Sequence, residues 1–479
     1  MQRWIPILSV LILSAAVAAT PVRAGNLVTA HFGGEQGNVA TDHPTALYFN
    51  PAGLALGVGW RIYAEGTIAW RTVDYTRSES AISNPASGEG MAGTPEDALA
   101  VNAGKATLSN VAAAPFLGVV TDLGVPNLGV GVGFYVPFGG QASWDKNEDV
   151  AGNQQYPGAE DGTQRWFDID GQWRSLYLTV AGAYRFAGPR LSIGAGINFT
   201  ESNIWTTRAR TPAGTDDLIT NTGTVAEGRS LVDTSGFALA ASIGVNWEAT
   251  PGLWLAASYQ SQPGFGNSTQ SGTLTNKFGA LAVSSNDIRI EQEIPDIIRV
   301  GARYQPMPSL ELRLAGDYQR WSVLDHQCLL KTSANPDAKC QIRDDGTAFG
   351  PDAGEIILSI PRQWKDTFGV TAGASYWVTP ALAVDGGVLF DSSPVPDKTM
   401  EASFPDQDKV FVRGGVRWAA MPDQLVVTLA LNEVFYLKRT VEPRQPGSIG
   451  TMGVSTVPDG AGTYKQNVVF LNLGAEYRF

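Results

Sequence analysis

Hydrophobic and polar residues alternate with a period of two along most of the chain from Gly59 onward. In residues 175–186 the odd positions are mostly polar or small, and the even positions are Leu176, Leu178, Val180, Gly182, Tyr184 and Phe186. Residues 310–318 and 410–418 repeat this pattern. A period of two is typical of β-strands that have one apolar face. The pattern therefore predicts an all-β protein.

Short turns and long polar loops separate these strands in strict alternation. The short turns contain Pro or Gly and lie near residues 124–127, 187–190, 249–252, 305–309, 378–381 and 420–423. The long loops lie at about residues 76–110, 138–170, 209–229, 263–283, 329–363, 394–407 and 440–463. Six short turns and seven long loops require fourteen strands with both chain ends on the short-turn side. Outer-membrane barrels have short periplasmic turns, long external loops and an even strand number. We predict a 14-stranded antiparallel transmembrane β-barrel.

The last predicted strand supports a membrane barrel over a secreted soluble β protein. One face of this strand carries Asn467, Val469, Leu471, Leu473, Ala475, Tyr477 and Phe479. The other face carries polar residues such as Asn472 and Glu476. A terminal aromatic residue on an amphipathic strand is typical of bacterial outer-membrane proteins. Strands in hydrocarbon must close because an open edge leaves backbone groups unpaired, and fourteen strands enclose a lumen too wide for side chains to fill.

The first residues do not alternate and predict two other segments. Residues 1–24 contain Arg3, an apolar stretch from Ile5 to Ala19 and a small residue before the cleavage point, which predicts a signal peptide. The apolar stretch is shorter than the roughly 20 residues of a membrane-spanning helix, and no later segment approaches that length. Residues 25–58 are predicted to fold into the lumen as a hatch, and residues 59–479 to form the barrel.

Composition and charge agree with this class and exclude some partners. The chain has 54 Gly, 28 Pro and 10% aromatic residues, which suits a turn-rich β protein. Without Arg3 and Arg23 the net charge changes from -12 to -14, which makes nucleic acid an improbable partner. Cys328 and Cys340 are twelve residues apart, and we expect either a loop disulfide or two free thiols.

The sequence offers little chemistry for a catalytic or metal site. The acidic stretches 145–149 and 167–171 lack the full ligand spacing of a calcium loop, so solvated external loops are favoured. Neither a Gly-x-Ser-x-Gly elbow nor a His-Glu-x-x-His motif occurs. We therefore expect no cofactor, no metal and no enzymatic activity, although His326 near Ser322 is a conceivable hydrolase pair.

Several stretches carry a resemblance to a known family. The stretch from Asp42 through Asn50, Pro51, Ala52 and Gly53 resembles the N-terminal hatch of the FadL/TodX family of outer-membrane transporters. The stretches "EIPDIIRVGARYQPMPSLELRLAGDYQRWSVLD" from Glu293 and "QWKDTFGVTAGASYWVTPALAVDGGVLFDSSPVPD" from Gln363 are similar to two strand pairs of that family. The resemblance implies a bacterial outer-membrane, passive transporter of long-chain fatty acids or other hydrophobic compounds, with a hatch in the lumen.

The resemblance also implies a route and its residues. In the family, the ligand leaves sideways into the membrane beside an inward kink in the third strand. Gly129, Gly131 and Gly133 in the predicted third strand suit such a kink, or equally make room for packing against the hatch. We expect Asn50 and Pro51 to fix the hatch near that strand. The side chains expected to face the ligand pocket are Leu27, Val28 and Phe32.

The expected partners are a hydrophobic small molecule, such as a fatty acid, an alkane or an aromatic hydrocarbon, and the lipid of the outer membrane around a monomer. Arg208 and Arg210 are the nearest candidates for a ligand carboxylate, but surface arginines that snorkel to the membrane interface are the favoured interpretation. A general diffusion porin and a structural or adhesive barrel are the alternative functions. The long segment before the first strand favours the transporter, because an open porin does not need it.

Overall fold

The structure is a computed structural model that describes residues 31–82, 96–216, 218, 226–279, 281–332, 335–445, 447–448 and 450–479. The predicted signal peptide, residues 1–24, and the predicted pocket residues Leu27 and Val28 lie outside these residues. In the described part of the chain, no helix combines the length and the apolar character that crossing a membrane would need.

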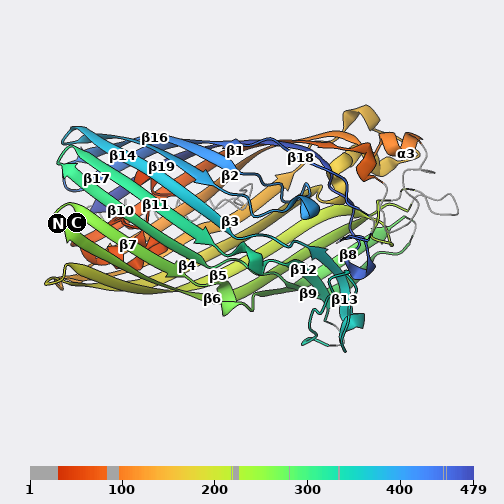
Figure 1. Ribbon diagram of the computed structural model, residues 1–479, viewed down its shortest axis with the longest axis horizontal. Coiled ribbons are helices and arrows are strands. Elements are labelled where there is room, and N and C mark those ends of the chain that lie inside the picture. Colours follow the sequence, from red (N-terminus) through yellow and green to blue (C-terminus); the bar gives the residue numbers. More distant parts are fainter. Residues whose placement is uncertain are drawn as a thin grey trace, which may run out of the picture.

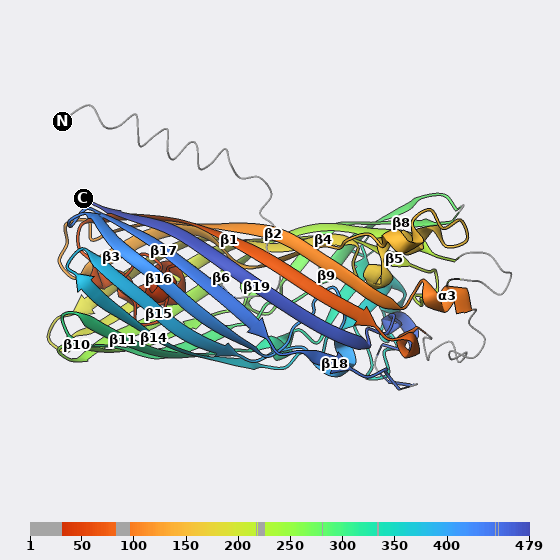
Figure 2. The ribbon, with the colours of Figure 1, turned by 90° about the horizontal axis from the view of Figure 1, so that it is seen from above.

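A closed antiparallel barrel of fourteen strands forms the body of the molecule, as the alternation predicts. Each strand pairs with its successor in the barrel, and the last pairs with the first. Figures 1 and 2 show the strands tilted around a long axis, with the C-terminus at the end that carries the short turns. The barrel strands are β1 (Trp60–Arg77), β2 (Gly104–Thr121), β3 (Leu128–Ser143), β4 (Asp170–Phe186), β5 (Leu191–Arg210), β6 (Gly228–Thr250), β7 (Leu253–Gln260), β10 (Ile297–Met307), β11 (Leu310–Gln319), β14 (Thr367–Thr379), β15 (Leu382–Asp391), β16 (Lys409–Met421), β17 (Leu425–Tyr436) and β19 (Gly462–Arg478).

Five further strands extend the wall at the opposite end, and all of them except β9 lie wholly or partly in segments that the sequence predicts to be polar loops. They are β8 (Thr269–Phe278), β9 (Ser284–Glu291), β12 (His326–Lys331), β13 (Ile356–Pro361) and β18 (Arg439–Val441). The loop predicted at residues 263–283 is therefore wrong over β8. β6 has 23 residues and β7 only 8, so the far half of β6 lacks a partner in β7 and pairs with β8 instead. The mostly polar sequence of β8 conceals this strand from a hydrophobic pattern.

Burial confirms which face of each strand points outward. On β4, Leu178, Val180, Tyr184 and Phe186 are exposed, whereas Ser175, Tyr177 and Thr179 are buried. On β1, the exposed indoles of Trp60 and Trp70 are ten positions apart. Ten residues span about 33 Å along a strand, or about 25 Å along the axis of a barrel whose strands tilt by about 40°. This distance matches the apolar band of an outer-membrane barrel.

The two ends of the barrel sheet meet at a seam between β1 and β19. Trp60 and Phe479 exchange two backbone hydrogen bonds, each 3.0 Å long, and their rings stack at 6.2 Å. The register between the two strands runs without a shift from Arg61 to Arg77. The last residue of the chain is therefore part of the closure of the barrel.

Short helices lie before β1 and in the loops at the far end. The first group is η1 (Gly34–Gln36), α2 (Ala46–Phe49) and η2 (Pro51–Leu56). The loop helices are η3 (Glu79–Ala81), α3 (Glu96–Ala100), η5 (Glu148–Val150), η6 (Pro157–Asp161), η7 (Thr163–Trp166), η8 (Pro263–Phe265), η9 (Trp321–Val323), η10 (Ala353–Glu355), η11 (Asp397–Thr399) and η12 (Gly453–Ser455). A disulfide joins Cys328 of β12 to Cys340 in the following loop, and both sulfurs belong to a small apolar cluster with Leu330, Ala338 and Ile356.

Candidate ligand pathway

Residues 31–57, which we call the N-terminal segment, lie against the inner face of the barrel and are bonded to several of its strands. Backbone groups at one end of the segment meet β1, β16 and β19: Gly33 N donates to Glu65 Oε2 (2.9 Å), Arg413 Nη1 donates to the Gly34 carbonyl (2.7 Å) and Asn472 Nδ2 donates to the His31 carbonyl (3.1 Å). At the other end, Ser258 Oγ of β7 donates to the Phe49 carbonyl at 2.7 Å. Different walls of the lumen therefore hold the segment (Figure 2).

Asn50 is the best-connected residue of the predicted hatch motif. Its Oδ1 accepts a hydrogen bond from Ala52 N at 3.1 Å, which caps η2 at the position where Pro51 begins the helix. Its Nδ2 donates to the Val39 carbonyl at 2.8 Å and to the Val245 carbonyl of β6 at 2.9 Å. Asn50 therefore fixes the fold of the segment and joins it to β6, on the wall beyond β5 rather than at the third strand.

The neighbouring motif residues explain why the motif needs small side chains. Ala52 is fully buried, and a Cβ on Gly53 would lie 2.1 Å from the Thr41 carbonyl oxygen. Asp42 lies at the far side of the segment, where its Oδ2 is 3.0 Å from Arg303 Nη1 and its carbonyl accepts a hydrogen bond from Arg61 Nη1 at 2.5 Å.

The two sides of the N-terminal segment differ in polarity. Toward β2 and β4, Leu47 and Leu54 pack in an apolar cluster with Val120, Ala181 and Ala183. Toward β11 and β16, the carboxylate of Glu35 lies between two arginines, 4.0 Å from Arg313 and 3.5 Å from Arg413. A polar cavity of about 290 Å³ lies between the segment and the strands from β10 to β19, and its lining includes Asp42, Arg303, Glu311, Arg313, Arg417 and Arg478. The N-terminal segment thus presents an apolar side toward β2 and β4 and a charged side toward β11 and β16.

Phe32 joins the N-terminal segment to the second and third strands through aromatic contacts. Its ring centroid is 5.2 Å from that of Tyr48, 4.6 Å from that of Phe116 on β2 and 5.5 Å from that of Tyr135 on β3. The hydroxyls of Tyr135 and Thr179 are 2.5 Å apart, which holds the Tyr135 ring against β4. The Phe32 side chain is 6% exposed and fills the space between these rings.

The hydrogen-bonded pairing of β2 and β3 is interrupted just beyond this aromatic cluster. The two strands are in register from Thr121 and Val130 to Phe116 and Tyr135, and pairing resumes only at the bridge between Leu108 and Trp144. We call the intervening residues 109–115 of β2 and 136–143 of β3 the β2–β3 break. Between β3 and β4 the register also shifts, between Tyr135 and Phe138. Pro115 and Pro137 lie within the break, and neither has an N–H group to donate.

The three glycines of the predicted kink lie before this irregularity. Gly129, Gly131 and Gly133 face regular partners on β4, and the last two also face partners on β2. A Cβ on Gly129 would lie 2.3 Å from the Leu54 carbonyl, and one on Gly133 would lie 2.9 Å from the Leu47 side chain. Of the two interpretations that the sequence left open, the geometry favours room for packing against the N-terminal segment.

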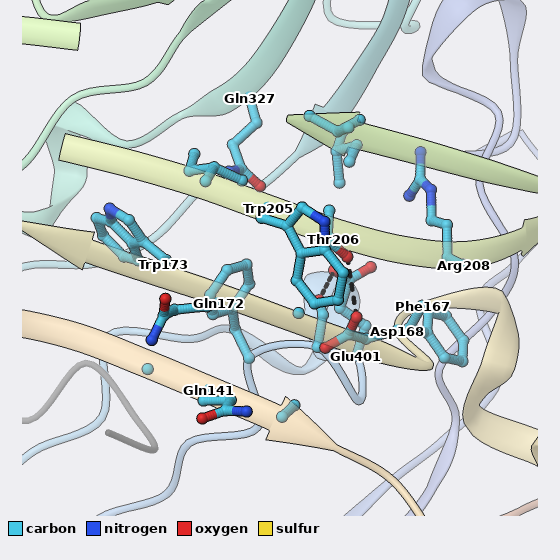
Figure 3. A pocket seen from close by; sticks show the side chains of 18 of the residues that line it. Gln141, Phe167, Asp168, Gln172, Trp173, Trp205, Thr206, Arg208, Gln327 and Glu401 are labelled. Atoms are coloured by element: carbon cyan, nitrogen blue, oxygen red, sulfur yellow. Dashed lines mark hydrogen bonds between the residues drawn. The ribbon is translucent and has the colours of Figure 1, made fainter. Parts of the chain in front are cut away.

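An apolar cavity adjoins the break on the inner side of the wall (Figure 3). Its apolar lining comes from Phe167, Trp173, Ile204, Val232, Ile290, Leu329, Ile360 and Phe404. Gly140, Gln141 and Ala142 of β3 also line it, so the cavity and the break share three residues. The free volume is about 90 Å³, so side chains at its rim must move to admit a long acyl chain.

Charged groups border this cavity, and most of them are paired. Arg362 Nη1 lies 2.6 Å from Glu401 Oε1, and Thr206 Oγ1 donates to Asp168 Oδ1 at 2.9 Å. Burial raises the pKa of Asp168 to about 8, so its carboxyl group is mostly neutral at pH 7. The side chain of Arg208, on β5, makes no hydrogen bond or ion pair with any other residue that the structure describes; it is half-buried and lines the cavity. The interpretation of Arg208 as a snorkelling surface arginine is therefore wrong, because its side chain belongs to the inner wall.

A match to a family model decides the classification of this barrel. The model described as outer membrane protein transport protein (OMPP1/FadL/TodX) matches residues 6–479. The chain belongs to the OMPP1/FadL/TodX family. It is therefore a protein of the bacterial outer membrane, and its family is one of transporter channels for hydrophobic compounds rather than of enzymes.

Individual relatives within the FadL/TodX family are distant. A long-chain fatty acid transport protein of Salmonella typhi is 30% identical over 74 residues, which are 15% of this chain and 17% of the relative. The corresponding protein of Escherichia coli K12 is 28% identical over 74 residues, again 17% of its length. The aligned stretch thus spans less than a fifth of these relatives.

Solved structures of the FadL/TodX family share the fold over almost the whole chain. A crystal structure of a Pseudomonas aeruginosa FadL homologue matches with a TM-score of 0.72 at 17% identity, covering 96% of this chain and 100% of that one. The P. putida toluene transporter TodX matches with a TM-score of 0.63 at 14% identity, covering 96% and 99%. Identities this low show the fold alone.

Some pathway residues of this FadL/TodX-family barrel were not among those predicted from the sequence. Trp173 continues the inward phase of Ser175 and Tyr177 on β4, so the alternation contains a signal for it. Phe404 lies in a loop without a regular pattern, and its place in the cavity has no equivalent signal.

Proposed function

We propose that this outer-membrane protein passively transports long-chain fatty acids or related hydrophobic compounds, which enter the apolar cavity and leave sideways through the β2–β3 break. Residues 1–24 are the signal peptide in this proposal, residues 25–58 the hatch and residues 59–479 the barrel. The observation that carries the proposal is that residues 140–142 line both the cavity and the break.

The distribution of polarity inside the barrel supports a sideways exit. The N-terminal segment occupies the lumen, its apolar side faces β2 and β4, and its charged side faces a polar cavity. An acyl chain loses about 0.8 kcal/mol for each CH2 group that returns to water. A path along the charged side is therefore unfavourable for the ligand, whereas a path between β2 and β3 leads from apolar side chains to lipid. Leu27, Val28 and Phe32 are the proposed gate-side contacts, and Phe32 already bridges the segment to Phe116 and Tyr135.

Arg208 supports an anionic amphiphile, such as a fatty acid, over a neutral aromatic hydrocarbon. It places a guanidinium at the rim of an apolar cavity, and the neighbouring Asp168 is mostly neutral at pH 7 because burial raises its pKa to about 8. A carboxylate that reaches Arg208 gains a charge-assisted hydrogen bond, which a hydrocarbon such as toluene cannot form.

Uptake of radiolabelled oleate by cells that lack their own fatty acid transporter tests the function. Cells that express the wild-type barrel should take up oleate, and Phe32→Ala should change the rate because it removes the aromatic contact to β2 and β3. Arg208→Met should weaken oleate binding about tenfold or more, the loss expected for a hydrogen bond to a charged group. Arg210→Met is the matched control, because Arg210 is two residues along the same strand and does not line the cavity.

Three results would contradict the proposal or part of it. Absence of oleate uptake by a folded wild-type barrel would contradict transport of fatty acids. Equal effects of Arg208→Met on oleate and toluene uptake would contradict the anionic head group. A steady ion conductance of the wild type in planar bilayers would favour a diffusion porin, since a barrel with a closed lumen should conduct almost no ions.

A further inference from the structure

Side chains replace the missing backbone pairing in the middle of the β2–β3 break. Asn110 Nδ2 of β2 donates to the Gln141 carbonyl of β3 at 3.0 Å. Arg71 Nη1 of β1 donates to the same carbonyl at 3.3 Å. Arg71 and Asn110 are direct neighbours in the β1–β2 register, so two adjacent strands hold one oxygen of the third.

The Gln141 carbonyl lies where the contact between β2 and β3 can be made or broken. Pairing is regular below it at Phe116 and Tyr135, and a single bridge joins the strands above it at Leu108 and Trp144. Gln141 is 8% exposed and also lines the apolar cavity. Whatever separates Gln141 from Asn110 and Arg71 therefore widens the wall at the level of the cavity.

A chain of hydrogen bonds connects Arg71, which lines the cavity, to the loop that carries Phe404. Arg71 Nη2 donates to Gln466 Oε1 at 3.1 Å, and Gln466 Nε2 donates to the Pro405 carbonyl at 2.8 Å. Pro405 follows Phe404, whose ring lines the cavity. A molecule that displaces Phe404 thus acts on a loop that is bonded, through Gln466, to Arg71.

We propose that Arg71 and Asn110 form a latch that holds β3 to β2 in the empty barrel and that filling of the cavity releases it through Phe404, Pro405 and Gln466. This inference rests on the proposed sideways exit. Backbone pairing is hard to break in hydrocarbon because unpaired groups find no water. Side chains can rotate to break and re-form their hydrogen bonds without a change in strand register, so such bonds suit a wall that must open and close. Arg71 and Asn110 are positioning residues in this scheme because both donate to the Gln141 carbonyl of β3, and Arg71 also lines the cavity.

Hydrogen exchange of residues 136–143, measured by mass spectrometry on the full chain in lipid nanodiscs, tests the latch directly. Asn110→Ala and Arg71→Leu should each increase exchange in this stretch about threefold to tenfold, the factor expected for one lost side-chain hydrogen bond. Because both groups donate to one carbonyl, the double variant should exchange more slowly than the product of the two single effects predicts. Arg71→Lys keeps a donor and should restore part of the protection.

Thr200→Val is the matched control. It removes a side-chain donor to a backbone carbonyl, Ala238 O at 2.9 Å, at a place where β5 and β6 are paired throughout. Exchange in residues 136–143 should be unchanged in this variant. Oleate added to the wild type should raise exchange in the same stretch, and the latch variants should respond less because they start open.

The outcomes separate the latch from the transport proposal. Unchanged exchange of residues 136–143 in both single variants overturns the latch, whatever the uptake rates are. If the increases in exchange of the two single variants multiply in the double variant, the two donors do not act through the shared Gln141 carbonyl. If the variants increase exchange but the wild type neither takes up oleate nor responds to it, the latch stands as a feature of the wall and the proposed function fails.

Discussion

Asn50→Ala should release the N-terminal segment from the barrel while leaving the barrel folded. The variant removes the amide that donates to the buried Val39 carbonyl and to the Val245 carbonyl of β6, and it removes the cap on Ala52 N. An unsatisfied buried polar group costs about 1–3 kcal/mol, and a lost N-cap about 1 kcal/mol. The unsatisfied Val39 carbonyl and the lost cap should therefore cost the segment about 2–4 kcal/mol of local stability. Since every 1.4 kcal/mol is a factor of ten, opening should become more than about 20-fold more frequent.

Hydrogen exchange of residues 31–57 measures this opening, and planar-bilayer recordings measure whether the lumen then conducts ions. Asn147→Ala is the matched control, because Asn147 caps η5 by accepting a hydrogen bond from Asp149 N at 3.2 Å in an exposed loop. The control should change neither readout. Exchange of residues 31–57 within about threefold of the wild type, together with a silent bilayer, would refute the assignment of Asn50 as the anchor of the segment.

Three further predictions follow from close approaches, the disulfide and one buried carboxyl. Gly129→Ala should displace η2 and raise exchange of residues 31–57, because the new Cβ would lie 2.3 Å from the Leu54 carbonyl, whereas Gly66→Ala, with no atom within 4 Å of the new Cβ, should not. Replacing Cys328 and Cys340 together by Ser should make trypsin cleavage after Lys331 or Lys339 faster by up to about 100-fold, since closing a loop of this size contributes about 3 kcal/mol. Oleate uptake should stay within twofold of the wild type, and equal cleavage rates would contradict a structural disulfide. Burial raises the pKa of Asp168 from 3.8 to about 8, so its contribution to loop stability is complete below pH 4 and is lost as the pH rises through 8. Protease resistance of residues 144–169 should therefore fall between pH 4 and pH 8 in the wild type and stay constant in Asp168→Asn. Equal pH profiles of the two proteins would contradict the raised pKa of Asp168.

The barrel could be predicted from the sequence because one physical rule governs its strands. Residues that face lipid must be apolar, so Leu178, Val180 and Tyr184 mark β4 as soon as the alternation is recognised. β8 escapes this rule because it lies beyond the apolar band, where both of its faces are largely polar. Its strand conformation follows from the unpaired length of β6, which is a tertiary cause.

The pathway was harder to predict because it depends on register. Pro115 and Pro137 are far apart in sequence, and only the pairing of β2 with β3 brings them into the same break. The glycines of β3 gave a visible signal, but their neighbours in space are Leu47 and Leu54. Arg208 looks like any arginine near the end of a strand until β9, β12 and β13 extend the wall around it. These contacts join distant parts of the chain, so no local pattern reveals them.

The pairing of β1 with β19 closes the barrel. Until β1 and β19 pair, the sheet has two edges whose backbone groups are unpaired, which hydrocarbon does not tolerate. The N-terminal segment is tethered three residues before the seam between these strands, since η2 ends at Leu56 and β1 begins at Trp60. The N-terminal segment can therefore enter the barrel between β1 and β19 before these strands pair, and it need not thread through a closed barrel. Pairing of β1 with β19 before the N-terminal segment has entered would leave the segment outside the lumen.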